Sequence, residues 1–179
     1  MDIGKEYLRI VIERFHSIKT LGDKTLSQLP EEEIHWRFNS ESNSVAIIVK
    51  HLSGNMISRW SDFLHSDGEK DYRNCDGEFI DDIPSKEELI SVWENGWTVL
   101  FKTLKGLNEQ DLLKTVYIRG EAHLVLDALE RQMAHYASHV GQMVYIAKQV
   151  KGENWKSLSI PKGKSEEYLK EMHEKHKDQ

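Results

Sequence analysis

The chain has 179 residues, of which 39% are hydrophobic and 30% charged, and its formal net charge is −6 at pH 7. This length suits one domain with a substantial core. The acidic balance argues against nucleic acid and anionic membrane surfaces as partners, because both require a basic face. The single cysteine, Cys75, excludes an intrachain disulfide and a cysteine-rich zinc module.

The first residues and the apolar runs predict a protein without export or membrane segments. Residues 1–15 mix charged residues into the apolar ones, unlike the uninterrupted core of a signal peptide. The longest strongly apolar run, "VAIIV" at 45–49, is far shorter than the roughly 20 residues that cross a bilayer. We therefore expect a cytoplasmic protein.

Apolar residues at helical spacing predict four long helices, at 3–21, 44–64, 85–104 and about 121–150. Asn43 or Ser44 is a suitable N-cap for the second helix, and Ser85 with Glu88 forms a capping-box pattern at the third. Only "TVYIR", at 115–119, has the composition of a short strand. This pattern predicts an all-α protein, a four-helix bundle over residues 1–165 with a solvated tail at 166–179.

One line along the fourth helix is polar in the middle and apolar at its ends. It runs through Leu124, Ala128, Arg131, His135, His139, Gln142 and Ile146. The apolar ends indicate that the line faces inward, where polar groups need partners. Two histidines four residues apart can direct their ring nitrogens at one divalent cation. In a chain with nine histidines, however, a pair at this spacing arises by chance more often than as part of a metal site.

His51 lies in the middle of the second helix, beside its apolar stripe. Asn55 extends the polar line by one turn, and Gly54 leaves room for a ligand or a closely packed helix. In a bundle, His51 can meet the pair on the fourth helix and complete a site with three nitrogens and an open position. Periodicity leaves equally open that His51 faces water.

At these residues the chain resembles a known superfamily. The segments that carry the resemblance are "SVAIIVKHLSGNMISRW", "SDGEKDYRNCDGEF", "GWTVLFKTL", "VYIRGEAHLVLDALERQMAHYASHVGQM" and "LSIPKG". They are similar to the DinB/YfiT-like superfamily, and most to a bacterial branch of uncharacterised function, over about residues 5–165. The resemblance implies a four-helix bundle, often dimeric, that holds a divalent metal through His51, His135 and His139.

Two functions follow as hypotheses. Characterised relatives in the superfamily include S-transferases and isomerases that use small thiols such as bacillithiol or mycothiol. The first hypothesis is therefore a transferase that joins a small thiol to an electrophilic substrate at a zinc or nickel ion, with the histidines as ligands only. No residue stands out as a general base, so the catalytic residues stay unassigned. The second is a non-catalytic metal-binding or sensing module. We expect a homodimer in either case.

The acidic loop after the second helix is a weaker candidate. Asp67, Glu69, Asp71 and Glu78 fall at the first, third, fifth and twelfth positions of an EF-hand-like loop. Tyr72 stands where the sharp turn requires glycine, so a solvated loop at the rim of a pocket is the better interpretation. Cys75 in this loop is expected to be inert. Further polar residues that either contact a substrate or serve only as ion pairs and caps are Arg59, Arg119, Glu121 and Gln142.

Overall fold

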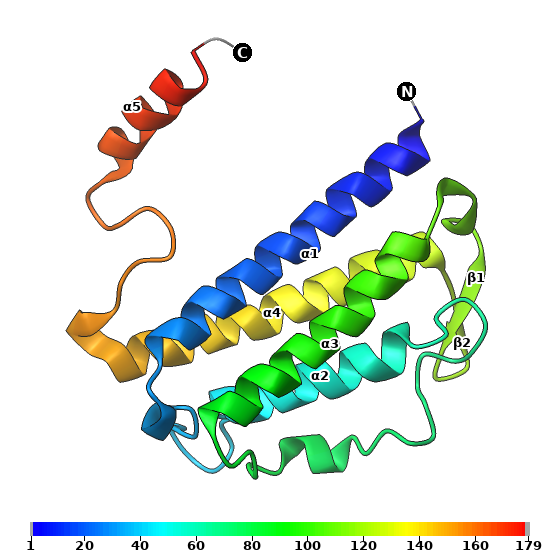
Figure 1. Ribbon diagram of the computed structural model, residues 1–179, viewed down its shortest axis with the longest axis horizontal. Coiled ribbons are helices and arrows are strands. Elements are labelled where there is room, and N and C mark those ends of the chain that lie inside the picture. Colours follow the sequence, from blue (N-terminus) through cyan, green and yellow to red (C-terminus); the bar gives the residue numbers. More distant parts are fainter. Residues whose placement is uncertain (1, 178–179) are drawn as a thin grey trace.

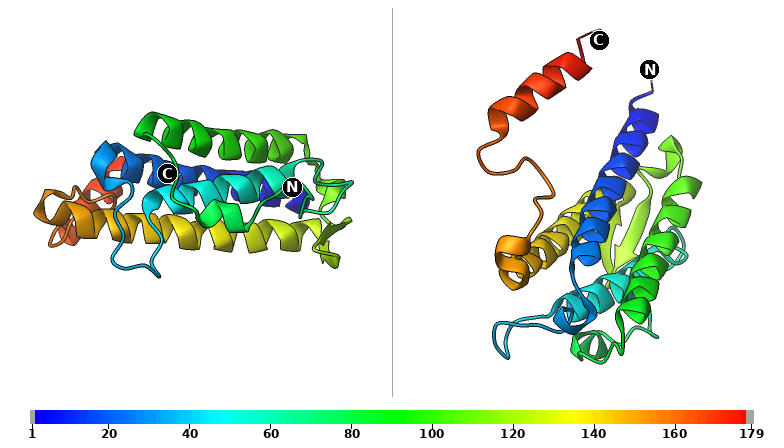
Figure 2. Two further views of the ribbon diagram at one scale, coloured as in Figure 1. Left: turned by 90° about the horizontal axis from the view of Figure 1, so that it is seen from below. Right: turned by 60° about the vertical axis from the view of Figure 1, so that its left-hand side comes forward.

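Four long helices form the body of the protein in a computed structural model that describes residues 2–177 (Figure 1). They are α1 (Ile3–Gln28), α2 (Val45–Trp60), α3 (Lys86–Gly106) and α4 (Val125–Lys151). Helix α2 packs against α3 and α4, and α1 packs against α4 and α3. Figure 2 (left) accordingly shows α1 and α2 between α3 and α4. The predominantly helical architecture fits the predicted all-α class.

The core between these helices is rich in aromatic side chains. The ring of Phe15 in α1 packs against Trp60 of α2 and Tyr136 of α4, with centroid distances of 6.2 and 6.0 Å. Trp93 and Trp97 of α3 pack beside them and are fully buried. No helix among residues 2–177 has the length and apolar character needed to cross a membrane.

Helix ends follow local signals in the sequence. The Ser44 hydroxyl accepts a hydrogen bond from the amide of Ile47, and the Ser85 hydroxyl accepts one from the amide of Glu88. Of the two candidates at α2 the N-cap is therefore Ser44, and the serine half of the capping-box pattern at α3 is confirmed. The predicted end of the first helix at residue 21 is wrong. Helix α1 continues to Gln28 and stops before Pro30, which disfavours helical geometry in the preceding residue.

A small antiparallel hairpin precedes α4. Strand β1 (Thr115–Ile118) pairs with β2 (Glu121–Leu124), which confirms the short strand predicted in this region. Helix was wrongly predicted at residues 121–124. The cause is the two-residue turn Arg119–Gly120, whose positive φ angles of 56° and 78° match a tight hairpin turn and set the next four residues in strand geometry.

The loop between α2 and α3 is tied to the tip of this hairpin. The amide of Gly68 donates to the carbonyl of Tyr117 at 2.8 Å. The Asp67 carboxylate accepts hydrogen bonds from the amides of Glu69, Arg119 and Gly120. These amides occupy the carboxylate oxygens of Asp67, the first position of the EF-hand-like pattern, so this residue is not free to bind calcium.

The remaining elements are short. Within residues 2–177, four 3-10 helices lie outside the long helices: η1 (Glu31–Glu33), η2 (Asp76–Phe79), η3 (Glu109–Asp111) and η4 (Gly152–Asn154). Helix α5 (Ser165–Lys175) stands apart from the four long helices in Figures 1 and 2 (right) and has no buried residue. The division into a bundle and a solvated tail at residue 165 stays a prediction.

Candidate metal centre

His51, His135 and His139 lie together where α2 crosses α4. The Nε2 atom of His135 is 3.4 Å from Nε2 of His51 and 3.1 Å from Nε2 of His139. One candidate ligand atom from each of the three lies within 4.8 Å of the other two. His51 therefore faces the pair on α4. The alternative, in which the His51 side chain points to water, is wrong.

The spacing of these nitrogens fits a metal ion. Zinc–nitrogen bonds of about 2.0–2.1 Å at tetrahedral angles place two ligand nitrogens about 3.3 Å apart. The two distances centred on His135 lie on either side of that value. Three histidines and an open position are typical of a catalytic zinc site, whereas structural sites use four protein ligands.

Two of the imidazoles have oxygen partners on the opposite side of the ring. Nδ1 of His51 lies 2.9 Å from a carboxylate oxygen of Glu78, and Nδ1 of His139 lies 2.9 Å from the amide oxygen of Gln142. An oxygen at this place accepts a hydrogen bond from Nδ1–H. The ring proton therefore stays on Nδ1, and the lone pair of Nε2 is available to a metal. Metal-bound histidines in proteins commonly have this arrangement.

Glu78 is the buried centre of a small polar network. Its carboxylate accepts hydrogen bonds from Nε and Nη2 of Arg73, at 2.7 and 2.8 Å, in a bidentate pair. Burial alone would raise the pKa of this carboxyl, but the bonds from Arg73 and His51 outweigh it and hold the pKa below its usual value. Glu78 therefore stays ionised and can accept a hydrogen bond from Nδ1–H of His51.

Gly54 explains how Glu78 reaches His51. A Cβ atom at position 54 would overlap the Glu78 carboxylate, so a larger residue there would force the Glu78 side chain out of this position. The sequence indicated that Gly54 leaves room for a ligand or a helix. The structure fills that room with the Glu78 side chain.

The histidines on α4 are held in the neutral form that a metal requires. Burial, and then the neighbouring His139 and His51, lower the pKa of His135 to about 3. Burial also lowers the pKa of His139. Both rings are therefore neutral at physiological pH and can act as ligands without first losing a proton.

The polar line on α4 does not face the core as predicted. The core-facing side of α4 carries Gln132, Tyr136, Val140, Met143 and Ala147, all fully buried. Most of the predicted line runs beside it: Ala128 is buried, but Leu124 is 42% exposed, and Arg131 and Gln142 lie at the surface. The histidines are thus half-buried on the flank between α4 and α2, where a ligand from solvent can reach them.

Other residues singled out in the sequence have structural partners. Asn55 accepts a hydrogen bond from the Tyr136 hydroxyl, which in turn accepts one from the Trp60 indole. The Cys75 thiol donates to Glu69, and burial and this carboxylate raise its pKa, which agrees with an inert thiol. Glu121 is exposed, and its carboxylate is 3.5 Å from His123.

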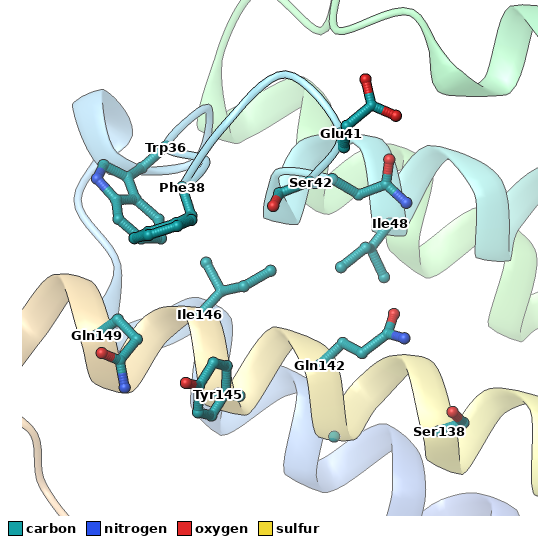
Figure 3. A pocket seen from close by; sticks show the side chains of 12 residues that line it. Trp36, Phe38, Glu41, Ser42, Ile48, Ser138, Gln142, Tyr145, Ile146 and Gln149 are labelled. Carbon is teal, nitrogen blue, oxygen red and sulfur yellow. The ribbon is translucent and has the colours of Figure 1, made fainter.

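Two recesses flank the histidine cluster. A cavity of about 380 Å³ has His51, His135 and several arginines in its wall. A larger and more open hollow of about 910 Å³ lies between α4 and the connector that follows α1 (Figure 3). Trp36 and Phe38 line it from the connector and Tyr145 from α4. Gln142, which contacts His139, links this hollow to the cluster.

Comparison with known protein families places the chain in one of them. A family described as "Protein of unknown function (DUF1572)" matches residues 2–164. The chain belongs to the DUF1572 family. No curated protein and no solved structure matches it. The three histidines and Glu78 of this DUF1572 protein all lie within the matched region.

Proposed function

We propose that this DUF1572 protein is a four-helix bundle of the DinB/YfiT-like type. We further propose that it is a divalent-metal-dependent transferase, which joins a small thiol to an electrophilic substrate. In this proposal His51, His135 and His139 hold one zinc or nickel ion. The observation that carries it is the convergence of three imidazoles. Nε2 of His135 lies at tetrahedral-ligand spacing from Nε2 of His51 and of His139, and one candidate ligand atom from each ring lies within 4.8 Å of the other two. The mid-helix histidine of α2 opposite the pair on α4 is also the arrangement that the superfamily resemblance implies.

The composition of the cluster favours an enzyme over a closed metal-binding module. Among residues 2–177, no other histidine, cysteine or acidic residue joins the three histidines in a potential metal-binding group. The nearest carboxylate, Glu78, is turned to the Nδ1 side of His51 and is occupied by Arg73. A position for an exogenous ligand therefore remains open.

Each residue has a limited task in the proposed reaction. A divalent ion held by the three imidazoles would keep its full charge and would lower the pKa of a thiol bound to it. Glu78 and Gln142 fix the orientation of His51 and His139. The apolar hollow lined by Trp36 and Phe38 offers a surface for an electrophilic substrate close to the cluster. No residue is assigned as general acid or base.

Titration of the cobalt-substituted protein with bacillithiol tests the proposed thiol chemistry. We expect sulfur-to-cobalt charge-transfer absorption to grow with added thiol. His139→Ala should abolish the signal because one ligand is lost. Cys75→Ser should leave it unchanged, because the Cys75 thiol contacts Glu69 and lies outside the histidine cluster.

The same titration separates the two functional hypotheses. If the spectrum does not respond to thiol while cobalt is fully bound by the three histidines, the transferase proposal is wrong. A metal-binding or sensing module would then be the remaining interpretation.

A further inference from the structure

Four arginines gather around the smaller recess beside the histidine cluster. They come from separate segments: Arg59 from α2, Arg73 from the loop before η2, Arg119 from the hairpin turn and Arg131 from α4. No acidic residue among residues 2–177 lines this cavity of about 380 Å³. Segments far apart in the chain thus bring guanidinium groups to one place.

The nearby carboxylates only partly compensate these charges. Glu69 lies 3.1 Å from Arg119 and 3.3 Å from Arg73, and Glu78 pairs with Arg73. Arg131 has no carboxylate partner among the described residues. The wall of the cavity therefore keeps an excess of positive charge, although the whole protein is acidic.

Arg59 is deeply buried and only weakly compensated. It is 2% exposed, and its Nε and Nη1 atoms have no hydrogen-bond partner. Its ion pair, from Nη2 to Glu69, is long at 3.8 Å. Burial of a charge with so little compensation is costly unless an anion comes close. Burial also favours the uncharged form and lowers the pKa of this guanidinium, which nevertheless stays protonated.

We propose that the arginine-lined cavity binds the carboxylate or phosphate group of a small organic anion. Guanidinium groups bind both kinds of oxyanion through paired, charge-assisted hydrogen bonds. The cavity is within the size range of small-molecule sites and is larger than an inorganic ion requires. Because His51 and His135 share its wall, a bound anion would extend toward the histidine cluster.

One part of this inference rests on the proposed function, namely that the bound anion is a substrate of the thiol reaction. Either the thiol or the electrophile then carries the charged group. The site itself is built from arginines, so its anion binding can be measured without a metal.

Calorimetric titration of the metal-free protein with inorganic phosphate and with succinate tests the site directly. We expect binding, and the tighter of the two probes identifies the preferred group. Arg131→Gln, at a surface position, should weaken that binding about tenfold or more through loss of a charge-assisted contact. Arg14→Gln makes the same charge change on the exposed face of α1 and should have no effect. Absence of binding by both probes at millimolar concentration, or equal weakening in both variants, would overturn the inference.

A second measurement connects the site to the thiol reaction. The cobalt-substituted protein should respond to mercaptosuccinate at lower concentration than to uncharged 2-mercaptoethanol, and Arg131→Gln should remove this preference. Equal responses to the two thiols would contradict an anionic substrate and leave the thiol reaction standing. If neither thiol changes the spectrum, the transferase proposal fails, and the phosphate and succinate titrations still decide whether the anion site exists.

Discussion

The orientation of His51 depends on a carboxylate from another segment of the chain. Glu78 follows His51 by 27 positions and reaches it through the loop between α2 and α3. Helical periodicity placed His51 correctly beside the stripe of α2, but it carries no information on the path of an irregular loop. Glu78 drew attention only as part of an EF-hand-like pattern, so its contact with His51 was missed. Gly54 was the one signal that something approaches α2 at this point.

Gly54→Ala should weaken metal binding without unfolding the protein. The new methyl group would displace the Glu78 carboxylate, and His51 would lose the oxygen that fixes its ring. Loss of such a partner typically costs about 10- to 100-fold in metal affinity. Competitive zinc titration with a chromophoric chelator measures this change.

Gly141→Ala is the matched control for this substitution. It makes the same change within α4, but a Cβ at position 141 meets nothing within 4 Å. Alanine should stabilise the helix by up to about 1 kcal/mol and leave zinc affinity unchanged. Equal zinc affinities in the two variants would show that Glu78 does not support the site.

The free energy of unfolding of the metal-free protein should fall as the pH is lowered below about 6.5, the ordinary histidine value. The pKa of His135 is about 3 in the folded protein, so the unfolded chain takes up a proton at this residue in the interval where the folded chain does not. Protonation then favours the unfolded state, and stability is lost toward low pH.

Urea denaturation at pH 7 and pH 5 measures this effect. His135→Leu should show a smaller loss of stability between the two pH values than the wild-type protein, because the residue that gains a proton on unfolding is absent. An equal loss in both proteins would mean that His135 does not contribute to the pH dependence.

At the scale of elements, the four long helices could be predicted because their apolar residues recur at helical spacing and their caps have the expected chemistry. The hairpin at 115–124 could be predicted only in its first strand. Glu121 to Leu124 have no strong strand preference, and the turn at Arg119–Gly120 sets their conformation. The predicted orientation of α4 is wrong by about 100°, the rotation of one helical residue, because the buried line through Tyr136 lies one position after the polar line through His135.

The contact between α2 and α3 depends on a small residue. A Cβ at Gly96 of α3 would lie 2.8 Å from the backbone Cα of Ser53 in α2, and a backbone atom cannot move aside as a flexible side chain can. Gly96→Ala should therefore destabilise the protein by about 1–3 kcal/mol, the usual cost of overpacking. Urea denaturation provides the measurement.

Gly106→Ala serves as the control because nothing lies within 4 Å of a Cβ at the end of α3. This variant should be as stable as the wild-type protein or slightly more stable. An unchanged stability in Gly96→Ala would show that the two helices can separate at no cost.

At the scale of the whole molecule, the relative order of the helices creates the site. His51 meets His135 and His139 because α2 packs against α4 as well as α3. The sequence alone predicts amphipathic helices but does not state which pair of helices is adjacent. The superfamily resemblance supplied that part of the expectation, and the geometry of the histidines agrees with it.

A homodimer stays a prediction of the superfamily resemblance. Large apolar side chains outside the two recesses, such as Ile3 and Leu113, are exposed by 86% and 70%, which leaves apolar surface for a second copy. Light scattering at micromolar concentration should give about twice the chain mass of 20.9 kDa. A mass of one chain would contradict the dimer without affecting the metal site.

Anomalous diffraction from crystals of the zinc-loaded protein, recorded on both sides of the zinc absorption edge, tests the central claim most directly. We predict one strong anomalous peak per chain, about 2.0–2.1 Å from the Nε2 atoms of His51, His135 and His139. Crystals of His139→Ala should lack the peak. A map in which His51 turns to solvent, with no peak between the three rings, would contradict the metal centre and the function proposed from it.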